Sequence, residues 1–133
     1  QETHVISAKI TKFEAAKAED IKSVEFWGDG TPLREFIYVD DLARACYFLL
    51  KVYSDNTPIN IGTNHELSIL ELSKIVANIV AYQGEITFND NLPNGAPRKL
   101  LDSTKIISLG WKPEIEIKDG LSLSYNWFLN NSV

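Results

Sequence analysis

The 133-residue sequence predicts a small mixed α/β domain. Segments with helical periodicity alternate with short segments rich in β-branched and aromatic residues, which is the pattern of an α/β chain. The predicted strands are few and widely spaced, and no Gly-x-Gly-x-x-Gly turn joins a strand to a helix. The chain therefore has neither a complete doubly wound sheet nor a dinucleotide phosphate cradle of its own.

Composition excludes several classes of protein. With 44% hydrophobic and 23% charged residues the chain is typical of a soluble globular domain, and a net charge of -5 disfavours nucleic-acid binding. No apolar run approaches the roughly 20 residues of a membrane span. The single cysteine, Cys46, excludes an internal disulfide framework and a cysteine-based zinc site. We expect no signal peptide, and these features fit a cytoplasmic setting. The sequence has no Met and starts with Gln1, so we expect a part of a longer protein.

The first third of the chain predicts a helix and two strands. Thr3 can cap a helix over residues 4–17, whose apolar residues recur at helical spacing. Residues 23–27 and 35–39 have strand character. Residues 28–34 contain two glycines and a proline, and they predict a hairpin-like connection between these strands.

A second helix is predicted over residues 42–53, capped by Asp40 or Asp41. Capping explains this pair of carboxylates more simply than catalysis does. The apolar residues of this helix predict its buried side: Ala43, Cys46, Tyr47, Leu49 and Leu50.

The rest of the chain predicts two more strands and three more helices. Strands are expected over 58–61 and 85–88, and Ser68 with Glu71 forms a capping box that opens a helix ending near Tyr82. A short helix from Thr104 to Gly110 precedes a last helix. This last helix spans 117–130, and its aromatic residues are expected to be buried: Tyr125, Trp127 and Phe128. A position at a rim is the alternative for Trp127.

Trp27 and Arg34 flank a glycine turn and form the first candidate site. An indole offers a flat face to a base or sugar, and a guanidinium offers a forked donor to phosphate. The alternative is a hairpin with a core Trp27 and an Arg34 paired with Glu35 or Asp40. Spacing alone favours that alternative.

Other residues carry weaker signals. Arg98 and Lys99 follow a Gly/Pro loop and could meet a pyrophosphate, although a solvated loop is the favoured explanation of a bare dibasic pair. His4 could give or take a proton, but a lone histidine at a helix start is more often a surface residue. His65 has no partner pattern and is expected at the surface, whereas Cys46 is expected in the core.

Several of these segments carry a resemblance to a known family. The matching stretches, in order, are Thr3–Ile6, Trp27–Ala43, Asn60–Thr63, Leu67–Ile69, Gly95–Asp102, Leu109–Pro113 and Tyr125–Leu129. In them the chain resembles the C-terminal half of the extended short-chain dehydrogenases/reductases. The Val-Asp-Asp-Leu-Ala segment is common to many nucleotide-sugar epimerases. The Trp-Gly-x-Gly-x-Pro-x-Arg-Glu-Phe and Pro-Arg-Lys-Leu-Leu-Asp motifs are sharper and indicate members that epimerise and reduce a GDP-sugar.

The resemblance implies that residues 1–133 are a C-terminal substrate-binding domain without the NADP-binding Rossmann half. The implied reaction of the parent is epimerisation of GDP-4-keto-6-deoxy-D-mannose at C3 and C5, followed by reduction at C4 with NADPH. The implied partners are the GDP-sugar, the missing N-terminal half and, for the parent, a second copy in a homodimer. Neither nucleic acid nor a membrane is implied.

The resemblance also assigns site residues. His4 matches a histidine that acts as an acid in epimerisation and lies beside the cofactor. The implied GDP-sugar-binding residues are Lys12, Trp27, Arg34 and Lys99. In that family the catalytic Ser, Tyr-x-x-x-Lys and Cys lie in the N-terminal half, so the resemblance implies that the chain alone is inactive and binds no NADP(H) tightly.

Two departures from the family pattern are small. Ser7 stands where the family often has Pro, and Asn94 replaces a common Asp before Gly95. Two alternatives remain: the corresponding domain of another nucleotide-sugar epimerase or dehydratase, and a non-catalytic nucleotide-sugar-binding domain.

Overall fold

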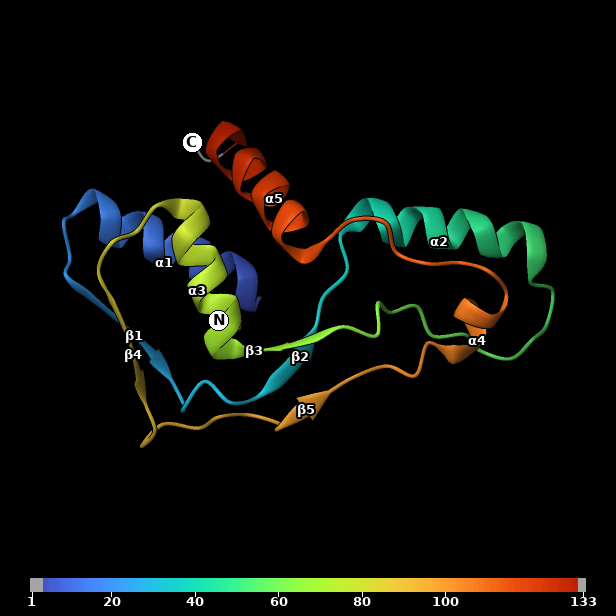
Figure 1. Ribbon diagram of the computed structural model, residues 1–133, viewed down its shortest axis with the longest axis horizontal. Helices are drawn as coiled ribbons and strands as arrows, with labels where there is room; N and C mark the ends of the chain where they lie inside the picture. The colour runs from blue at the N-terminus through green and yellow to red at the C-terminus, as the bar shows by residue number, and fades with distance from the viewer. Residues whose placement is uncertain (1–3, 132–133) are drawn as a thin grey trace.

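The structure is a computed structural model and describes residues 4–131. Three helices lie together at one end of the molecule: α1 (Val5–Ala18), α3 (Ile69–Val80) and α5 (Ile117–Asn131). Two others, α2 (Val39–Val52) and α4 (Thr104–Ser108), lie at the opposite end (Figure 1). The fold is small, mixed and α/β, as predicted.

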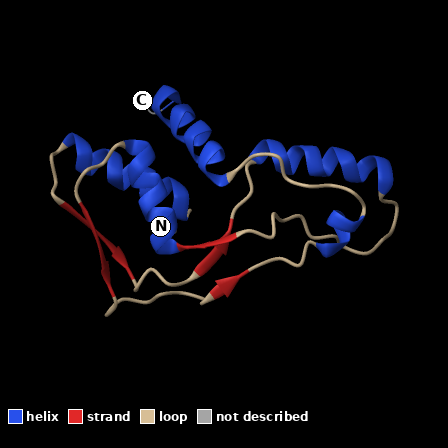
Figure 2. Ribbon diagram, in the orientation of Figure 1, coloured by secondary structure: helices blue, strands red, loops and turns tan. Residues whose placement is uncertain are grey.

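Five short strands form two small sheets (Figure 2). The strands β1 (Ser23–Trp27) and β4 (Glu85–Asn89) pair in parallel. In the second sheet β2 (Leu33–Glu35) lies between antiparallel β3 (Glu66–Ser68) and parallel β5 (Arg98–Lys99).

The predicted hairpin between the first two strands is wrong. β1 and β2 belong to different sheets, and residues 36–38 are irregular rather than part of a strand over 35–39. Gly28 and Gly30 have φ of +80° and +78°, which a glycine adopts at little cost, and they carry the chain from one sheet to the other. A turn rich in glycine fits both outcomes, so the sequence pattern could not separate them.

The larger core lies between the helices α1 and α3 and the β1–β4 sheet. Phe13 and Leu72 are fully buried there, and the apolar stripe predicted for the first helix faces this core. The capping box is confirmed: Glu71 N–H donates to Ser68 Oγ (3.1 Å), and Ser68 N–H donates to the Glu71 carboxylate (2.7 Å). Thr3, the predicted cap of the first helix, lies outside the described residues.

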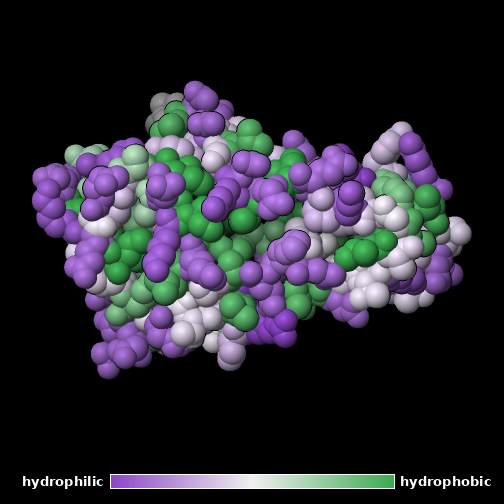
Figure 3. Space-filling view, in the orientation of Figure 1, coloured by the Kyte–Doolittle hydropathy of each residue, from purple (hydrophilic) through white to green (hydrophobic). Residues whose placement is uncertain are grey.

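The helix α2 buries only part of the side that was predicted: Leu49 packs against a small core, but most of the other predicted residues are exposed. Cys46 is exposed rather than in the core, and Tyr47 and Leu50 are also exposed, Leu50 by 83%. Ala45, together with Ile106 and Trp111, forms a second, smaller core instead. Apolar residues at the surface of this end of the molecule are visible in Figure 3. Apolar residues lie on two sides of α2. Contacts with residues elsewhere in the chain decide which of the two sides is buried.

Asp41 stabilises the fold by a contact that the sequence did not predict. The first turn of α2 has no side-chain cap, and its N-cap residue is Tyr38. Asp41 is fully buried and accepts hydrogen bonds from the backbone N–H groups of Glu114 and Ile115, at 3.2 and 2.9 Å. Arg44 pairs with the same carboxylate. Asp41 therefore fastens the segment before α5 to α2.

Two further predictions need correction. Residues 58–61 form no strand, because no described strand lies beside them to pair with. Trp127 is 68% exposed rather than in the core, whereas Tyr125 is buried as predicted. The predicted end of α3 near Tyr82 is confirmed: the helix ends at Val80, and its C-cap Ala81 has a left-handed conformation (φ 60°).

Neither a membrane-crossing helix nor a cluster of metal ligands is found within residues 4–131. No helix in this range combines the necessary length and apolar character. No group of three or more His, Cys, Asp or Glu side chains in it could hold a metal ion.

Glu14 is predicted to make stability depend on acid pH. Burial opposes its ionisation, but hydrogen bonds from Lys17 and Tyr125 outweigh burial and lower its pKa below 4.5. The ionised carboxylate therefore stabilises the fold above about pH 4.5, and this contribution is lost as the pH falls through the lowered pKa. We expect Glu14→Gln to cost about 1 kcal/mol at pH 7 and less at pH 3.

Urea unfolding of the natural protein and of Glu14→Gln at pH 7 and pH 3 measures the loss of stability at each pH. Glu19→Gln is the control, because Glu19 is exposed and follows α1 directly. A Glu14→Gln penalty that is equal at pH 7 and pH 3 would contradict the assignment.

Candidate functional site

Two loops join the two sheets and run side by side (Figure 1). Residues 28–32 connect β1 to β2, and residues 90–97 connect β4 to β5. Gly28 is required here because a Cβ on it would lie 2.1 Å from Asn94 Oδ1. Three hydrogen bonds join the loops and strand ends: Gly28 N–H to the Asn89 carbonyl (2.9 Å), Asp29 N–H to Asn94 Oδ1 (2.7 Å) and Leu33 N–H to the Pro97 carbonyl (2.8 Å).

Arg34 and Lys99 lie on neighbouring strands at the same register position. Residues paired across two strands project their side chains to the same face of the sheet, so these two cations share a face. Arg34 Nη1 donates to the Leu33 carbonyl at 2.7 Å, and a Cβ on Gly95 would lie 3.7 Å from Arg34 Nη2. The guanidinium therefore extends beside the 90–97 loop.

Neither cation is neutralised by an acid within the described part of the chain. The expected alternative, an Arg34 paired with Glu35 or Asp40, is wrong, since no ion pair to Arg34 forms among residues 4–131. Lys99 likewise has no ion pair in this range, and it is exposed. Both side chains remain available to an anionic ligand.

Trp27 and Lys12 lie at the end of β1. Trp27 is 69% exposed, which excludes a core role for its indole. Lys12 projects from α1, donates to the Glu25 carbonyl and places its ammonium 5.1 Å from the centre of the Phe26 ring. Lys12 therefore lies against the Phe26 face of β1, and the side chain of the exposed Trp27, the next residue, alternates to the opposite face.

The structure brings one pair of the predicted residues together: Arg34 pairs with Lys99 across β2 and β5. Lys12 approaches β1 from α1 at Glu25 and Phe26, and Trp27 ends that strand. His4 is not in this group. It is the exposed N-cap of α1, eight residues before Lys12, or about 12 Å along the helix axis. His65 is exposed, as predicted.

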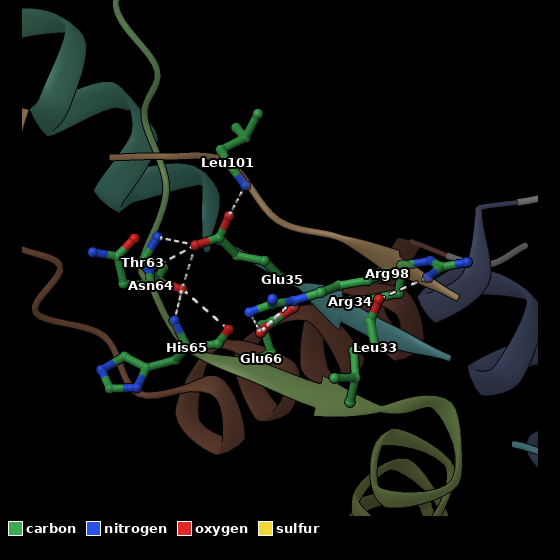
Figure 4. A network of polar contacts seen from close by, with 9 residues as sticks. All are labelled: Leu33, Arg34, Glu35, Thr63, Asn64, His65, Glu66, Arg98 and Leu101. Atoms are coloured by element: carbon green, nitrogen blue, oxygen red, sulfur yellow. Dashed lines mark hydrogen bonds and ion pairs between the residues drawn. The ribbon is translucent and has the colours of Figure 1, made fainter. Parts of the chain in front are cut away.

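Glu35 organises the other side of β2 and was missed by the sequence analysis (Figure 4). Its carboxylate accepts hydrogen bonds from the backbone N–H groups of Thr63 (2.7 Å), Asn64 (2.6 Å) and Leu101 (3.4 Å). A Cβ on Gly62 would lie 2.7 to 2.8 Å from the two carboxylate oxygens, so only glycine fits there. The glycine at this position was the signal that could have indicated a close approach.

Arg98 is committed to the framework rather than to a ligand. It forms a forked pair with Glu66, with N–O distances from 2.6 to 3.1 Å (Figure 4). This pair lowers the pKa of the Glu66 carboxyl through hydrogen bonding. The dibasic segment therefore divides its roles: Arg98 holds β5 near β3, and Lys99 stays free of acidic partners among the described residues.

Comparison with known proteins agrees with this architecture. Residues 1–62 match the NAD dependent epimerase/dehydratase family. The chain is 45% identical to GDP-L-fucose synthase 1 of Arabidopsis thaliana, over 98% of the chain and 41% of that protein. It is 41% identical to the GDP-L-fucose synthase of Escherichia coli, over 97% of the chain and 43% of that protein.

Solved structures show the same fold. The GDP-mannoheptose C4 reductase of Campylobacter jejuni, solved with NADP bound, superposes with a TM-score of 0.82 and 40% identity. The match covers 96% of this chain and 45% of that one. The UDP-glucose 4-epimerase of Thermotoga maritima, solved with UDP-glucose, gives a TM-score of 0.83 at 27% identity, over 100% of this chain and 41% of that one.

Fold and matches together relate the chain to epimerases and reductases: residues 1–62 match the NAD dependent epimerase/dehydratase family, and the solved C4 reductase has the same fold. Within this class it is homologous to the GDP-L-fucose synthases over nearly all of its own length. It spans about two fifths of the length of these relatives.

Proposed function

We propose that the chain is the C-terminal, substrate-binding domain of a GDP-L-fucose synthase. In this proposal the complete enzyme epimerises GDP-4-keto-6-deoxy-D-mannose at C3 and C5 and then reduces it with NADPH to GDP-L-fucose. The observation that carries the proposal is the placement of Arg34 and Lys99, two cations without acidic partners among residues 4–131, on one face beside the loops that lead to Trp27.

Each of the four binding residues has a role that follows from its chemistry. The guanidinium of Arg34 can hold a phosphate with two donors, while Lys12 and Lys99 supply point charges to the diphosphate. The exposed indole of Trp27 offers an apolar face to the guanosine or the sugar. A net negative chain would otherwise repel such a ligand, so local positive charge is required.

His4 is the proposed acid for the epimerisation steps. A 4-keto group acidifies the neighbouring C–H bonds at C3 and C5, so one acid/base pair can act at each carbon through an enolate. The exposed position of His4 at the start of α1 leaves its imidazole free to exchange protons with a sugar. In this arrangement the diphosphate would lie toward Lys12 and the sugar toward His4.

The residues described here do not fit the phosphate-binding turn of NADP. No strand in the range 4–131 leads through a glycine-rich turn into a helix: the glycines after β1 lead to β2, and α3 follows β3 through the Ser68 capping box. When bound to the complete enzyme, NADPH would supply the hydride for the reduction.

The missing Rossmann half is the proposed partner of this domain. Apolar side chains of α2 are exposed, among them Val39, Tyr47 and Leu50. Exposed apolar groups in one area mark contact surfaces. A domain seated on α2 would cover them, and we propose that this domain is the N-terminal half of the same enzyme. The isolated chain is then expected to oxidise no NADPH.

The choice of nucleobase tests the proposed substrate. Titration of the complete gene product with GDP, UDP and dTDP should give the lowest Kd for GDP. A second candidate, a UDP-sugar 4-epimerase, is favoured by the match to the UDP-glucose 4-epimerase fold. Preference for UDP would support that candidate and reject the first.

His4→Gln should slow epimerisation more than reduction. Glutamine keeps a hydrogen-bonding side chain but cannot donate a proton as imidazolium does, so we expect a loss of about 10²- to 10⁴-fold in exchange at C3 and C5. Solvent deuterium incorporation into the sugar measures the first step, and NADPH consumption with an already epimerised keto sugar measures the second. His65→Gln is the matched control. Equal losses in both steps would reject the specific acid role.

A further inference from the structure

Lys9 is a buried cation next to the proposed binding site. It lies on α1, one helical turn before Lys12, and only 3% of the residue is exposed. Its ammonium lies 3.5 Å from the centre of the Phe26 ring and 5.9 Å from that of Phe88. The Lys9 side chain therefore extends from α1 toward the β1–β4 sheet and contacts Phe26, the residue before Trp27.

This cation has no counter-ion within residues 4–131. No ion pair or side-chain hydrogen bond to Lys9 occurs in this range, and Lys12 is the nearest charge that affects it. The carboxylates of neighbouring elements bind elsewhere: Glu25 with Asn89, Asp29 with Thr31, Glu71 with Ser68, and Glu14 with Lys17 and Tyr125.

A buried charge without a partner is costly, and its pKa shows this. Burial first, and the like charge of Lys12 second, lower the pKa of Lys9 from 10.5 to about 8. The face of the Phe26 ring compensates only in part, since a cation–π contact stabilises by about 0.5–2 kcal/mol. An anion bound beside Lys9 and Lys12 would therefore stabilise the charged forms of these two neighbouring lysines.

We propose that Lys9 is a further binding residue for the ligand's diphosphate, acting with Lys12 at the end of β1. The proposal rests on the proposed function, because it places the diphosphate beside Lys12 and Trp27. Lysine has a flexible four-carbon stem, so its ammonium can turn from the Phe26 ring toward an anion held by Lys12. None of the family motifs in the sequence includes Lys9.

A coupling between binding and protonation follows. A diphosphate attracts the charged form of Lys9 and raises its pKa, so binding takes up a proton when the pH is near or above 8. Affinity is therefore full below pH 8 and falls as the pH rises through the range between the free and the bound pKa. The phosphates of GDP are already fully ionised there, since a terminal phosphate has its last pKa near 6.

Calorimetric titration of the complete gene product with GDP at pH 7 and pH 9.5 tests the proposal. We expect the affinity of the natural protein to fall about tenfold between the two values. Lys9→Met keeps the length and the contact with Phe26 but removes the charge. It should bind about tenfold more weakly at pH 7 and show no comparable fall at pH 9.5. Lys51→Met is the matched control, because Lys51 also lies over an aromatic ring, that of Tyr47 at 4.1 Å, but on α2.

Lys9→Arg provides a second variant if Lys9→Met fails to fold. Arginine stays charged at both pH values, so this variant should retain most of the affinity at pH 7 and lose the pH dependence. The proposal would be overturned if Lys9→Met bound GDP with the affinity and the pH profile of the natural protein. It would also be overturned if the affinity of Lys9→Arg for GDP fell as strongly at pH 9.5 as that of the natural protein.

Inorganic pyrophosphate as a second probe separates this proposal from the proposed function. If pyrophosphate binds with the Lys9-dependent pH profile while GDP binds no better than UDP, the Lys9 assignment stands and the substrate assignment fails. If GDP is preferred and Lys9→Met changes nothing, the reverse holds. If neither GDP nor pyrophosphate binds the natural protein, both are rejected.

Discussion

Asp41→Ala should lower the free energy of unfolding by about 3–5 kcal/mol, the range for removing one partner of a buried ion pair. The carboxylate of Asp41 is fully buried and binds the guanidinium of Arg44 and two backbone N–H groups at Glu114 and Ile115. Alanine would leave the two backbone N–H groups without this acceptor, would leave Arg44 paired with Glu114 alone and would release the segment that leads into α5. The smaller core beneath α2 should loosen as a result.

Chemical unfolding of the variant and of Asp40→Ala measures this effect. Asp40 is the adjacent carboxylate, but it is exposed, so its removal should change stability by at most about 0.5 kcal/mol. Similar midpoints for the two variants would contradict the role given to Asp41. Comparing Asp41→Ala with Asp40→Ala also distinguishes the buried contact of Asp41 from helix capping, the role that the sequence suggested for either residue.

Arg34→Ala should weaken GDP binding by about 1.5–3 kcal/mol, or roughly 10- to 150-fold, which is the range for hydrogen bonds to charged groups. Among the described residues the guanidinium has only the Leu33 carbonyl as a partner, so its remaining donors can meet a phosphate. Little structure depends on the side chain, so we expect the loss to occur in binding and not in folding.

Arg98→Ala is the matched control for Arg34. Both arginines lie on strands of the same sheet, but Arg98 is held by Glu66. Isothermal titration of the complete gene product with GDP should therefore show a much smaller loss for Arg98→Ala. Equal Kd values for Arg34→Ala and the natural protein would remove Arg34 from the site.

Local signals in the sequence predicted much of the fold. The apolar stripe of α1, the Ser68–Glu71 capping box and the strand character of residues 23–27 are properties of contiguous residues, and all three are confirmed. The class was equally accessible, because few short strands between helices are incompatible with a complete doubly wound sheet.

Features that depend on distant partners could not be predicted. The buried side of α2 is chosen by Ile106 and Trp111, some sixty residues later, and so Cys46 was assigned to the wrong side. Residues 58–61 have strand composition but lack a described neighbour to pair with. Asp41 looked like a cap, because no local pattern reveals the amides of Glu114 and Ile115.

The candidate site residues could be named from the sequence, but their arrangement could not. Spacing alone favoured an ion pair between Arg34 and a neighbouring acid. Only the resemblance to a family made Arg34 a stronger candidate for ligand binding. The register of β2 against β5 then placed Arg34 beside Lys99, a contact between residues 65 positions apart. Lys9 gave no signal, because an isolated lysine on a helix is usually solvated; its burial between α1 and Phe26 is a property of the folded chain alone.

A crystal structure of the complete gene product with GDP bound would locate the diphosphate. The proposed function places it in contact with Arg34, Lys99 and Lys12, with the nucleoside or the sugar position against Trp27. A diphosphate bound elsewhere, for example in the cavity of about 520 Å³ between Lys74 of α3 and Lys118 of α5, would contradict it.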